Sequence, residues 1–178
     1  DVPWSLSFLM GALLIATGPT VITPILNVIS VRDRVGAALE TEGIVNDVTA
    51  AILAVVIFDL AVAGGGSLPQ LLGSFVSRLG IGLLVGVVTA AIIWYLLKYV
   101  DLTPSNAVQN ARLVVLIGAI ATFGIAEALA PEAGIAAVAT SGVLLGNADL
   151  PYEAEIEAFK GDITLIVLSF VFISLATL

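Results

Sequence analysis

The chain has 178 residues, of which 60% are hydrophobic and 11% are charged, and its formal net charge is −8. A soluble domain is about 45–50% apolar and about 25% charged, so this composition predicts an integral membrane protein. The sequence contains no cysteine and no histidine, which excludes a disulfide framework, a thiolate metal site and histidine-based catalysis within these residues. The acidic balance argues against nucleic acid as a partner.

Six apolar segments follow one another along the chain, and each predicts a helix. They comprise residues 4–31, 35–63, 68–100, 107–130, 132–147 and 153–178. All but the fifth reach the roughly 20 residues that a membrane-spanning helix needs, and the fifth would be only about 24 Å long. The expected fold class is therefore an all-α polytopic membrane protein with about six transmembrane helices. Because the chain starts without Met and ends inside an apolar run, we expect residues 1–178 to be a single transmembrane domain that is part of a longer one.

The basic residues predict an orientation for these helices. With alternating threading, Arg78 lies on one face of the membrane and the other five basic residues lie on the opposite face. Those five are Arg32, Arg34, Lys98, Arg112 and Lys160. By the positive-inside rule, the face with five basic residues is cytoplasmic.

The first segment is interrupted in its middle by Thr17, Gly18 and Pro19, and Pro24 follows. In a helix interior, Gly costs about 1 kcal/mol and Pro about 3 kcal/mol, so we predict that this helix is discontinuous. Backbone groups freed at membrane depth are tolerated where protein or a water-lined cavity satisfies them, and broken helices line the substrate sites of secondary transporters. A proline kink without any ligand is the alternative.

The second segment carries Glu40, Glu42, Asn46 and Asp47 within eight residues. An acidic side chain at the centre of a span costs about 2.5–3.5 kcal/mol on insertion scales, which favours a role in binding or moving charge. At about 100° per residue, Glu40, Gly43 and Asp47 share one stripe of the helix. Glu42 and Asn46 lie on a second stripe and are expected to face a different neighbour.

Other charged residues have simpler interpretations. Glu40 and Asp59 are expected to lie at the two membrane interfaces, and Arg78 to extend toward the outer interface. Glu127 ends the fourth segment and is either an interfacial acid or a residue of the ion pathway. The sequence does not decide between these two roles of Glu127.

Two pairs of glycines predict close helix packing. Gly82 and Gly86 form one small-xxx-small motif in the third segment, and Gly142 and Gly146 form another in the fifth. The polar run at residues 152–162 precedes the last apolar stretch. It predicts a short amphipathic entry at the interface.

Three stretches resemble monovalent cation/proton antiporters, and they occur in the family's order. Residues 11–19, GALLIATGP, resemble the family segment GA-x-x-A-A-T-D-P. Residues 39–47, LETEGIVND, resemble L-E-G-E-S-L-L-N-D. Residues 126–147 resemble A-E … G-I-L-A-V-V-x-A-G-L-x-L-G-N. The Asn-Asp segment is the most specific of the three.

This resemblance implies a site for a transported cation. Asp47 would hold a proton and a cation alternately, with Asn46 beside it and Thr17 as a further ligand of Na⁺. Asn before the aspartate is similar to the electroneutral sodium/proton branch. Glu42 would pair with an arginine beyond residue 178. The broken helix, which contains Pro19, would cross its counterpart from an inverted repeat.

The resemblance further implies that the full-length protein is a homodimer in the cell membrane that serves pH homeostasis without a cofactor. Two residues depart from the family pattern. Gly18 stands where the family has Asp, and Gly43 stands where it has Ser. Both changes bear on the choice among Na⁺, K⁺ and Li⁺.

The predicted function is secondary active exchange of a monovalent cation, Na⁺ first, for H⁺. A K⁺/H⁺ antiporter, a cation channel and a membrane piece that transports nothing remain as alternatives. An intramembrane aspartyl hydrolase is excluded for Asp47 and Asp59, because twelve residues on one helix separate them by about 18 Å. We therefore expect a transporter and not an enzyme.

Overall fold

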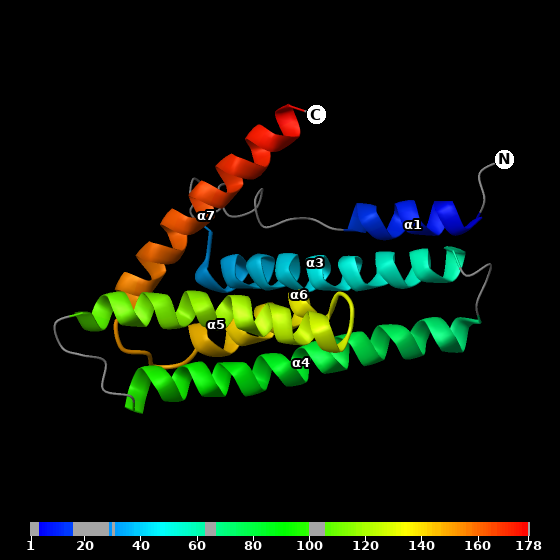
Figure 1. Cartoon of the computed structure of the whole chain (residues 1–178). Coiled ribbons are helices and arrows are strands. Elements are labelled where there is room, and N and C mark those ends of the chain that lie inside the picture. The colour runs from blue at the N-terminus through cyan, green and yellow to red at the C-terminus, as the bar shows by residue number, and fades with distance from the viewer. Residues whose placement is uncertain (1–3, 16–28, 30, 63–66, 100–105, 178) are drawn as a thin grey trace.

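A computed structural model describes residues 4–15, 29, 31–62, 67–99 and 106–177 of the chain. These residues form six α-helices (Figure 1). The helices are α1 (Trp4–Ile15), α3 (Asp33–Val62), α4 (Leu68–Tyr99), α5 (Ala107–Leu129), α6 (Ala133–Gly146) and α7 (Glu153–Ala176). The predicted all-α fold class is confirmed, and the boundaries of α3 to α7 lie close to the apolar segments that the sequence defines.

Four of these helices, α3, α4, α5 and α7, are long and apolar enough to cross a membrane. The other two are shorter apolar helices, and α6 has only 14 residues, as its segment predicted. The predicted break at Thr17, Gly18 and Pro19 lies outside the residues that the structure describes. It therefore remains a prediction.

The long helices pack side by side in alternating directions. Helices α3, α5 and α7 begin, and α4 and α6 end, at the same end of the bundle, on the left of Figure 1. This alternation brings Arg34, Lys98 and Arg112 to that end, as the orientation argument requires. Helix α6 contacts α3, α4 and α5, whereas α1 packs on α3. The short helix α6 and the long helix α4 therefore each contact three other helices and join the bundle together.

The closest packing in the bundle lies between α4 and α6. A Cβ atom added to Gly82 would lie 2.6 Å from the Ala136 Cβ atom and 2.7 Å from the Ala133 carbonyl oxygen. One added to Gly86 would lie 2.5 Å from the Ala137 carbonyl oxygen. Only glycine permits the two backbones to approach this closely. The predicted packing role of the motif in α4 is confirmed.

The second glycine pair does not pack in this way. Within the part of the chain that the structure describes, a Cβ atom added to Gly142 or Gly146 would meet no atom within 4 Å. The packed face of α6 is formed by Ala133, Ala136 and Ala137, and the two glycines lie on another face. The prediction of a packing seam at these glycines is wrong here, because the motif does not specify which face of the helix meets a neighbour.

The turn between α5 and α6 is held by Glu127. Its Oε1 atom accepts a hydrogen bond from the Glu132 backbone N–H (2.9 Å), and its Oε2 atom accepts one from that of Gly134 (3.2 Å). Glu132 has a left-handed backbone with φ 66°. A carboxylate at the N-terminus of α6 satisfies free N–H groups and interacts favourably with the helix dipole. This geometry gives Glu127 a structural role.

Arg78 and Asp59 form an ion pair that joins the end of α3 to the beginning of α4. The Arg78 Nη2 and Asp59 Oδ2 atoms are 2.6 Å apart, and the two side chains are 14% and 53% exposed. The sequence did not predict this pair, and the position of both residues at the outer interface remains a prediction. A guanidinium on an apolar helix is stabilised by pairing with a nearby carboxylate.

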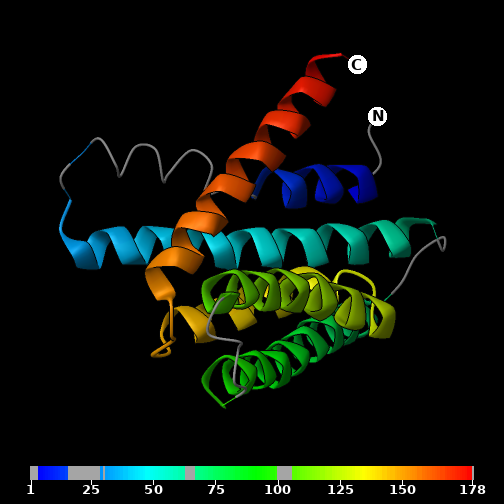
Figure 2. The same ribbon diagram turned by 60° about the vertical axis from the view of Figure 1, so that its left-hand side comes forward.

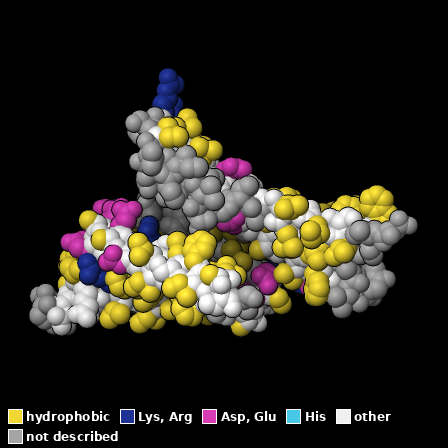
Figure 3. Space-filling view, turned by 90° about the horizontal axis from the view of Figure 1, so that it is seen from above, with side chains coloured by type: hydrophobic (Ala, Val, Ile, Leu, Met, Phe, Trp, Pro, Cys, Tyr) yellow, Lys and Arg dark blue, Asp and Glu magenta, His cyan; other side chains and the backbone are white. Residues whose placement is uncertain are grey.

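Helix α7 is continuous from its polar start, as the segment 153–178 predicted, and the position of that start at the membrane interface remains a prediction. Near that start, Arg112 of α5 donates from Nε to the Glu155 carbonyl oxygen (3.1 Å) and lies over the Phe159 ring. Farther along, α7 extends away from the bundle, and none of its described residues is buried (Figure 2). Seen from above, acidic and basic side chains gather at the end where α7 begins, and hydrophobic side chains cover much of the rest (Figure 3).

Candidate functional site

Asp47 lies well inside the apolar part of α3. It is 14 residues from the start of the helix at Asp33, which corresponds to about 21 Å along the axis. No proline interrupts α3, so the chain stays helical through the polar group. The Oδ1 atom of Asp47 is buried and has no hydrogen-bond partner among the described residues. A buried carboxylate oxygen without a partner is costly, which marks Asp47 as a functional candidate.

The two stripes of α3 have different surroundings. Gly43, one turn before Asp47, is buried. On the other stripe, the Asn46 Nδ2 atom donates a hydrogen bond to Glu42 Oε1 (2.7 Å), and Glu42 itself is exposed. Glu40 is exposed in the first third of the helix, and its position at the membrane interface remains a prediction. The structure therefore shows the two stripes on α3 that helical periodicity predicted.

Three of the predicted site residues, Thr17, Gly18 and Pro19, lie outside the described part of the chain. How they are placed relative to Asp47 is therefore still a prediction. The structure describes Glu42, Gly43, Asn46 and Asp47 of the predicted set.

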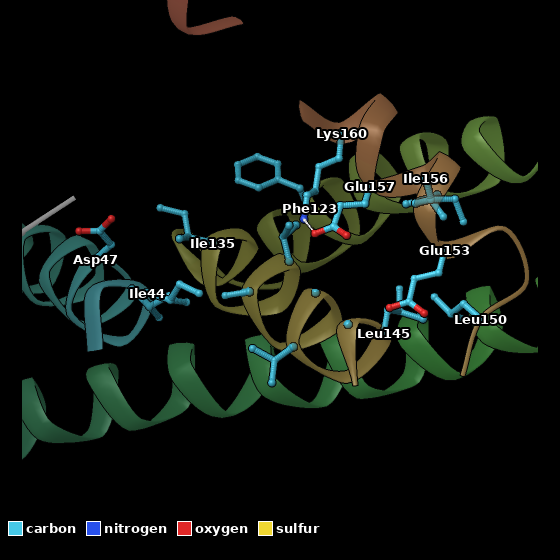
Figure 4. A pocket seen from close by; sticks show the side chains of 17 residues that line it. Ile44, Asp47, Phe123, Ile135, Leu145, Leu150, Glu153, Ile156, Glu157 and Lys160 are labelled. Carbon is cyan, nitrogen blue, oxygen red and sulfur yellow. Dashed lines mark ion pairs between the residues drawn. The ribbon is translucent and has the colours of Figure 1, made fainter. Parts of the chain in front are cut away.

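Asp47 lines a cavity of about 780 Å³ between α3, α5, α6 and the beginning of α7 (Figure 4). Asp47 and Ile44 lie at one end of this cavity, and Glu153, Glu157 and Lys160 lie toward the other end. Between them the lining is mostly apolar and comes largely from α6. Its α6 residues are Ile135, Val138, Ala139, Gly142, Val143, Leu145 and Gly146.

Sequence reasoning missed the contribution of α7 to this cavity. The available signal was the group Glu153, Glu157 and Lys160, which directly follows an apolar helix. From the sequence these residues indicate an interfacial entry, because their proximity to the cavity depends on how α7 packs on α5.

The arrangement suits a single positive charge. Among the described residues, no group of three acidic, histidine or cysteine side chains is placed to hold a metal ion together. The inner end of the cavity has one carboxylate, that of Asp47. A single carboxylate in apolar surroundings is neutralised by one proton or by one monovalent cation.

Four long apolar helices define a multi-pass integral membrane protein, and one of them carries a buried carboxylate oxygen, that of Asp47. Residues 1–178 match the family described as "Sodium/hydrogen exchanger, transmembrane". The chain belongs to this family of transmembrane exchangers and is a multi-pass integral protein of the cell membrane.

Two curated relatives are similar to the chain. One is the K(+)/H(+) antiporter NhaP2 of Shewanella oneidensis, with 29% identity over 149 residues, which cover 83% of this chain and 25% of that protein. The other has the same name, comes from Shewanella sp. strain ANA-3 and is 28% identical over 149 residues, with the same coverage. The chain spans about a quarter of the length of these relatives. No solved structure is significantly similar to it.

Proposed function

We propose that the full-length protein exchanges a monovalent cation, Na⁺ in the first place, for H⁺ across the cell membrane. In this proposal Asp47 holds either a proton or a cation. The observation that carries the proposal is the Asp47 Oδ1 atom, which is buried without a hydrogen-bond partner among the described residues and belongs to a side chain that lines a cavity. Membership of the exchanger family supports it.

Competition for one carboxylate is sufficient for exchange. Crossing the membrane with a bare carboxylate is penalised, whereas crossing with a bound proton or cation costs much less. If Asp47 binds only one of the two at a time, movement of one ion in one direction is coupled to movement of the other in the opposite direction. The proposed further ligands are Asn46, beside Asp47 on α3, and Thr17.

The remaining predicted residues have supporting roles in this proposal. Glu42 holds Asn46 by accepting its hydrogen bond. In the full-length protein Glu42 would also pair with an arginine from a later helix. Gly43 is buried one turn from Asp47 and leaves space beside the ion. Gly18 and Pro19 would interrupt the preceding helix. Residues 1–178 would form one transmembrane domain of an inverted-repeat protein that is a homodimer at full length.

K⁺ is the second candidate cation. Both curated relatives are named K(+)/H(+) antiporters. Gly18 and Gly43 also remove an acid and a hydroxyl that the family pattern has near the ion. Exchange measured with Na⁺ and with K⁺ as chloride salts, in the same vesicles, distinguishes the two.

The test of the proposal is Asp47→Asn in the full-length protein, reconstituted in proteoliposomes. We expect the variant to lose cation-dependent proton movement completely, because a neutral amide can neither release a proton nor balance a cation. Glu40→Gln is the matched control, since it removes an exposed acid from the same helix and should leave exchange intact. Exchange that persists in Asp47→Asn would refute the assignment. Cation flux in the wild type without proton counterflow would indicate a channel.

A further inference from the structure

We propose that the end of α4 binds an anionic phospholipid of the cytoplasmic leaflet, with the headgroup phosphate at Lys98 and the acyl chains along the outward face of the helix. The residues that form this site do not line the cavity at Asp47, so it is separate from the proposed cation site. The inference does not depend on which cation is exchanged.

Four side chains in the last two turns of α4 form a cluster of aromatic rings around one positive charge. The Lys98 Nζ atom lies 4.8 Å from the centre of the Trp94 ring, which is a cation–π contact. The Tyr99 ring packs edge-on against Trp94 with the ring centres 5.8 Å apart, and the Tyr95 and Tyr99 ring centres are 5.2 Å apart. The indole N–H, the ammonium and the two hydroxyl groups are all hydrogen-bond donors. Such a set of donors suits a phosphate, which offers several acceptor oxygens.

The charge of Lys98 is available to a ligand. Lys98 is exposed, and no acidic side chain in the described part of the chain pairs with it, whereas Arg78 and Lys160 each have a carboxylate nearby. By the positive-inside rule this end of α4 is cytoplasmic, and anionic headgroups of that leaflet attract lysines near the membrane surface. Charge complementarity therefore favours an anionic lipid over a zwitterionic one.

An exposed apolar stripe continues from this cluster along α4. Its residues recur every three or four positions, which places them on one side of the helix, and each is between 52% and 69% exposed. They are Leu84, Val88, Ile92, Tyr95 and Tyr99. The stripe lies opposite the face that carries Gly82 and Gly86, and α4 lies on the outside of the bundle (Figure 1, Figure 2).

The order of residues along the stripe matches the layers of a lipid. Tyr95 and Tyr99 lie beside the charged end, and aromatic residues of this kind are enriched at the level of the headgroups. Leu84, Val88 and Ile92 follow toward the middle of the span and offer aliphatic contacts to acyl chains. A lipid bound here would therefore meet the helix with its headgroup and its chains at the same time.

The fluorescence of Trp94 tests the site directly. The 178 residues contain two tryptophans, Trp4 and Trp94, so replacing every other tryptophan of the full-length protein by phenylalanine leaves Trp94 as the only indole. Bromine on a lipid quenches an indole that it contacts, so vesicles with brominated lipids report which lipid lies at the ring. We expect brominated phosphatidylglycerol to occupy the site about fivefold more readily than brominated phosphatidylcholine at low ionic strength.

Two substitutions of Lys98 and a matched control assign this preference. Lys98→Gln should remove it, because the remaining donors are neutral, whereas Lys98→Arg keeps the charge and should retain it. Lys160→Gln is the control, since it removes an exposed lysine from the same end of the bundle that has no contact with Trp94. It should leave the fivefold preference in place. Equal reductions in Lys98→Gln and Lys160→Gln would mean that only the general surface charge matters, which overturns the site.

Other occupants of this face give different results. Equal quenching of the wild type by the two lipids would overturn the proposal. No quenching by either lipid would mean that a further helix or a second copy of the chain covers the stripe, and this would overturn it as well. Inorganic phosphate added at constant ionic strength should leave the preference unchanged, and its loss would mean that the cluster binds free phosphate instead of a lipid.

Discussion

The two faces of α6 carry similar small residues but have opposite surroundings. On one face, Ala133, Ala136 and Ala137 are buried against α4. There, Gly82 and Gly86 allow the two helix backbones to approach each other closely. On the other face, Gly142 and Gly146 border a cavity that leads to Asp47. Small residues therefore serve close packing in one case and open space in the other. Substitutions that enlarge a side chain on each face distinguish the two uses.

The largest stability effect is expected at the packed face. Gly86→Leu would place several atoms where the Ala137 carbonyl oxygen and the Thr140 side chain already lie. We expect the free energy of unfolding to decrease by about 3 kcal/mol or more, because neither helix backbone can move without losing other contacts. Thermal unfolding of the purified full-length protein in detergent measures this. A melting temperature equal to that of the wild type would contradict the close approach of α4 and α6.

A smaller loss is expected at the turn that positions α6. Glu127→Ala removes the acceptor for two backbone N–H groups, at Glu132 and Gly134. We expect the free energy of unfolding to decrease by about 2 kcal/mol, which is typical when a helix cap with charge-assisted hydrogen bonds is removed. Glu132→Gln, which changes a neighbouring acid but not the acceptor, should unfold at nearly the wild-type temperature. If both variants unfold alike, Glu127 does not hold this turn.

The ion pair at the outer end of the bundle should contribute still less. Asp59→Asn leaves Arg78 without its carboxylate, but Asp59 is half exposed and water replaces part of the interaction. We expect the free energy of unfolding to decrease by about 1 kcal/mol, and this effect should be smaller at high salt. The double variant Asp59→Arg with Arg78→Asp restores opposite charges and should recover part of that loss. Thermal unfolding without any recovery would argue against a direct pair.

The smallest stability effect is expected on the open face, where the effect on transport should be large. Gly142→Leu enters open space, so we expect the free energy of unfolding to change by about 0.5 kcal/mol or less. The same side chain would narrow the cavity and slow exchange. Measuring unfolding and transport on one preparation checks both, with Gly124→Leu as control, since Gly124 also has open space but does not line the cavity. Strong destabilisation by Gly142→Leu would show that this face is packed in the full-length protein.

Some of the candidate site could be predicted from the sequence. Asp47 stands out because an acid in a long apolar helix is costly, and its separation from Glu42 follows from helical periodicity alone. The contribution of α7 could not be predicted, because Glu157 is distant from Asp47 in the chain and reaches the cavity only through the packing of α7 on α5. The same holds for the pairing of Arg78 with Asp59, which lie on different helices.

The sequence by itself determined the order of the described helices and the approximate length of α3 to α7, because each apolar segment carries its own length in its local sequence. It also determined that α4 could approach a neighbour closely at Gly82 and Gly86. Only the tertiary structure decided which face of α6 meets α4, that Glu127 caps α6, and that Asp47 lines the same cavity as the start of α7. Those features depend on the rotation of each helix relative to its neighbours, and contacts among several helices set that rotation together.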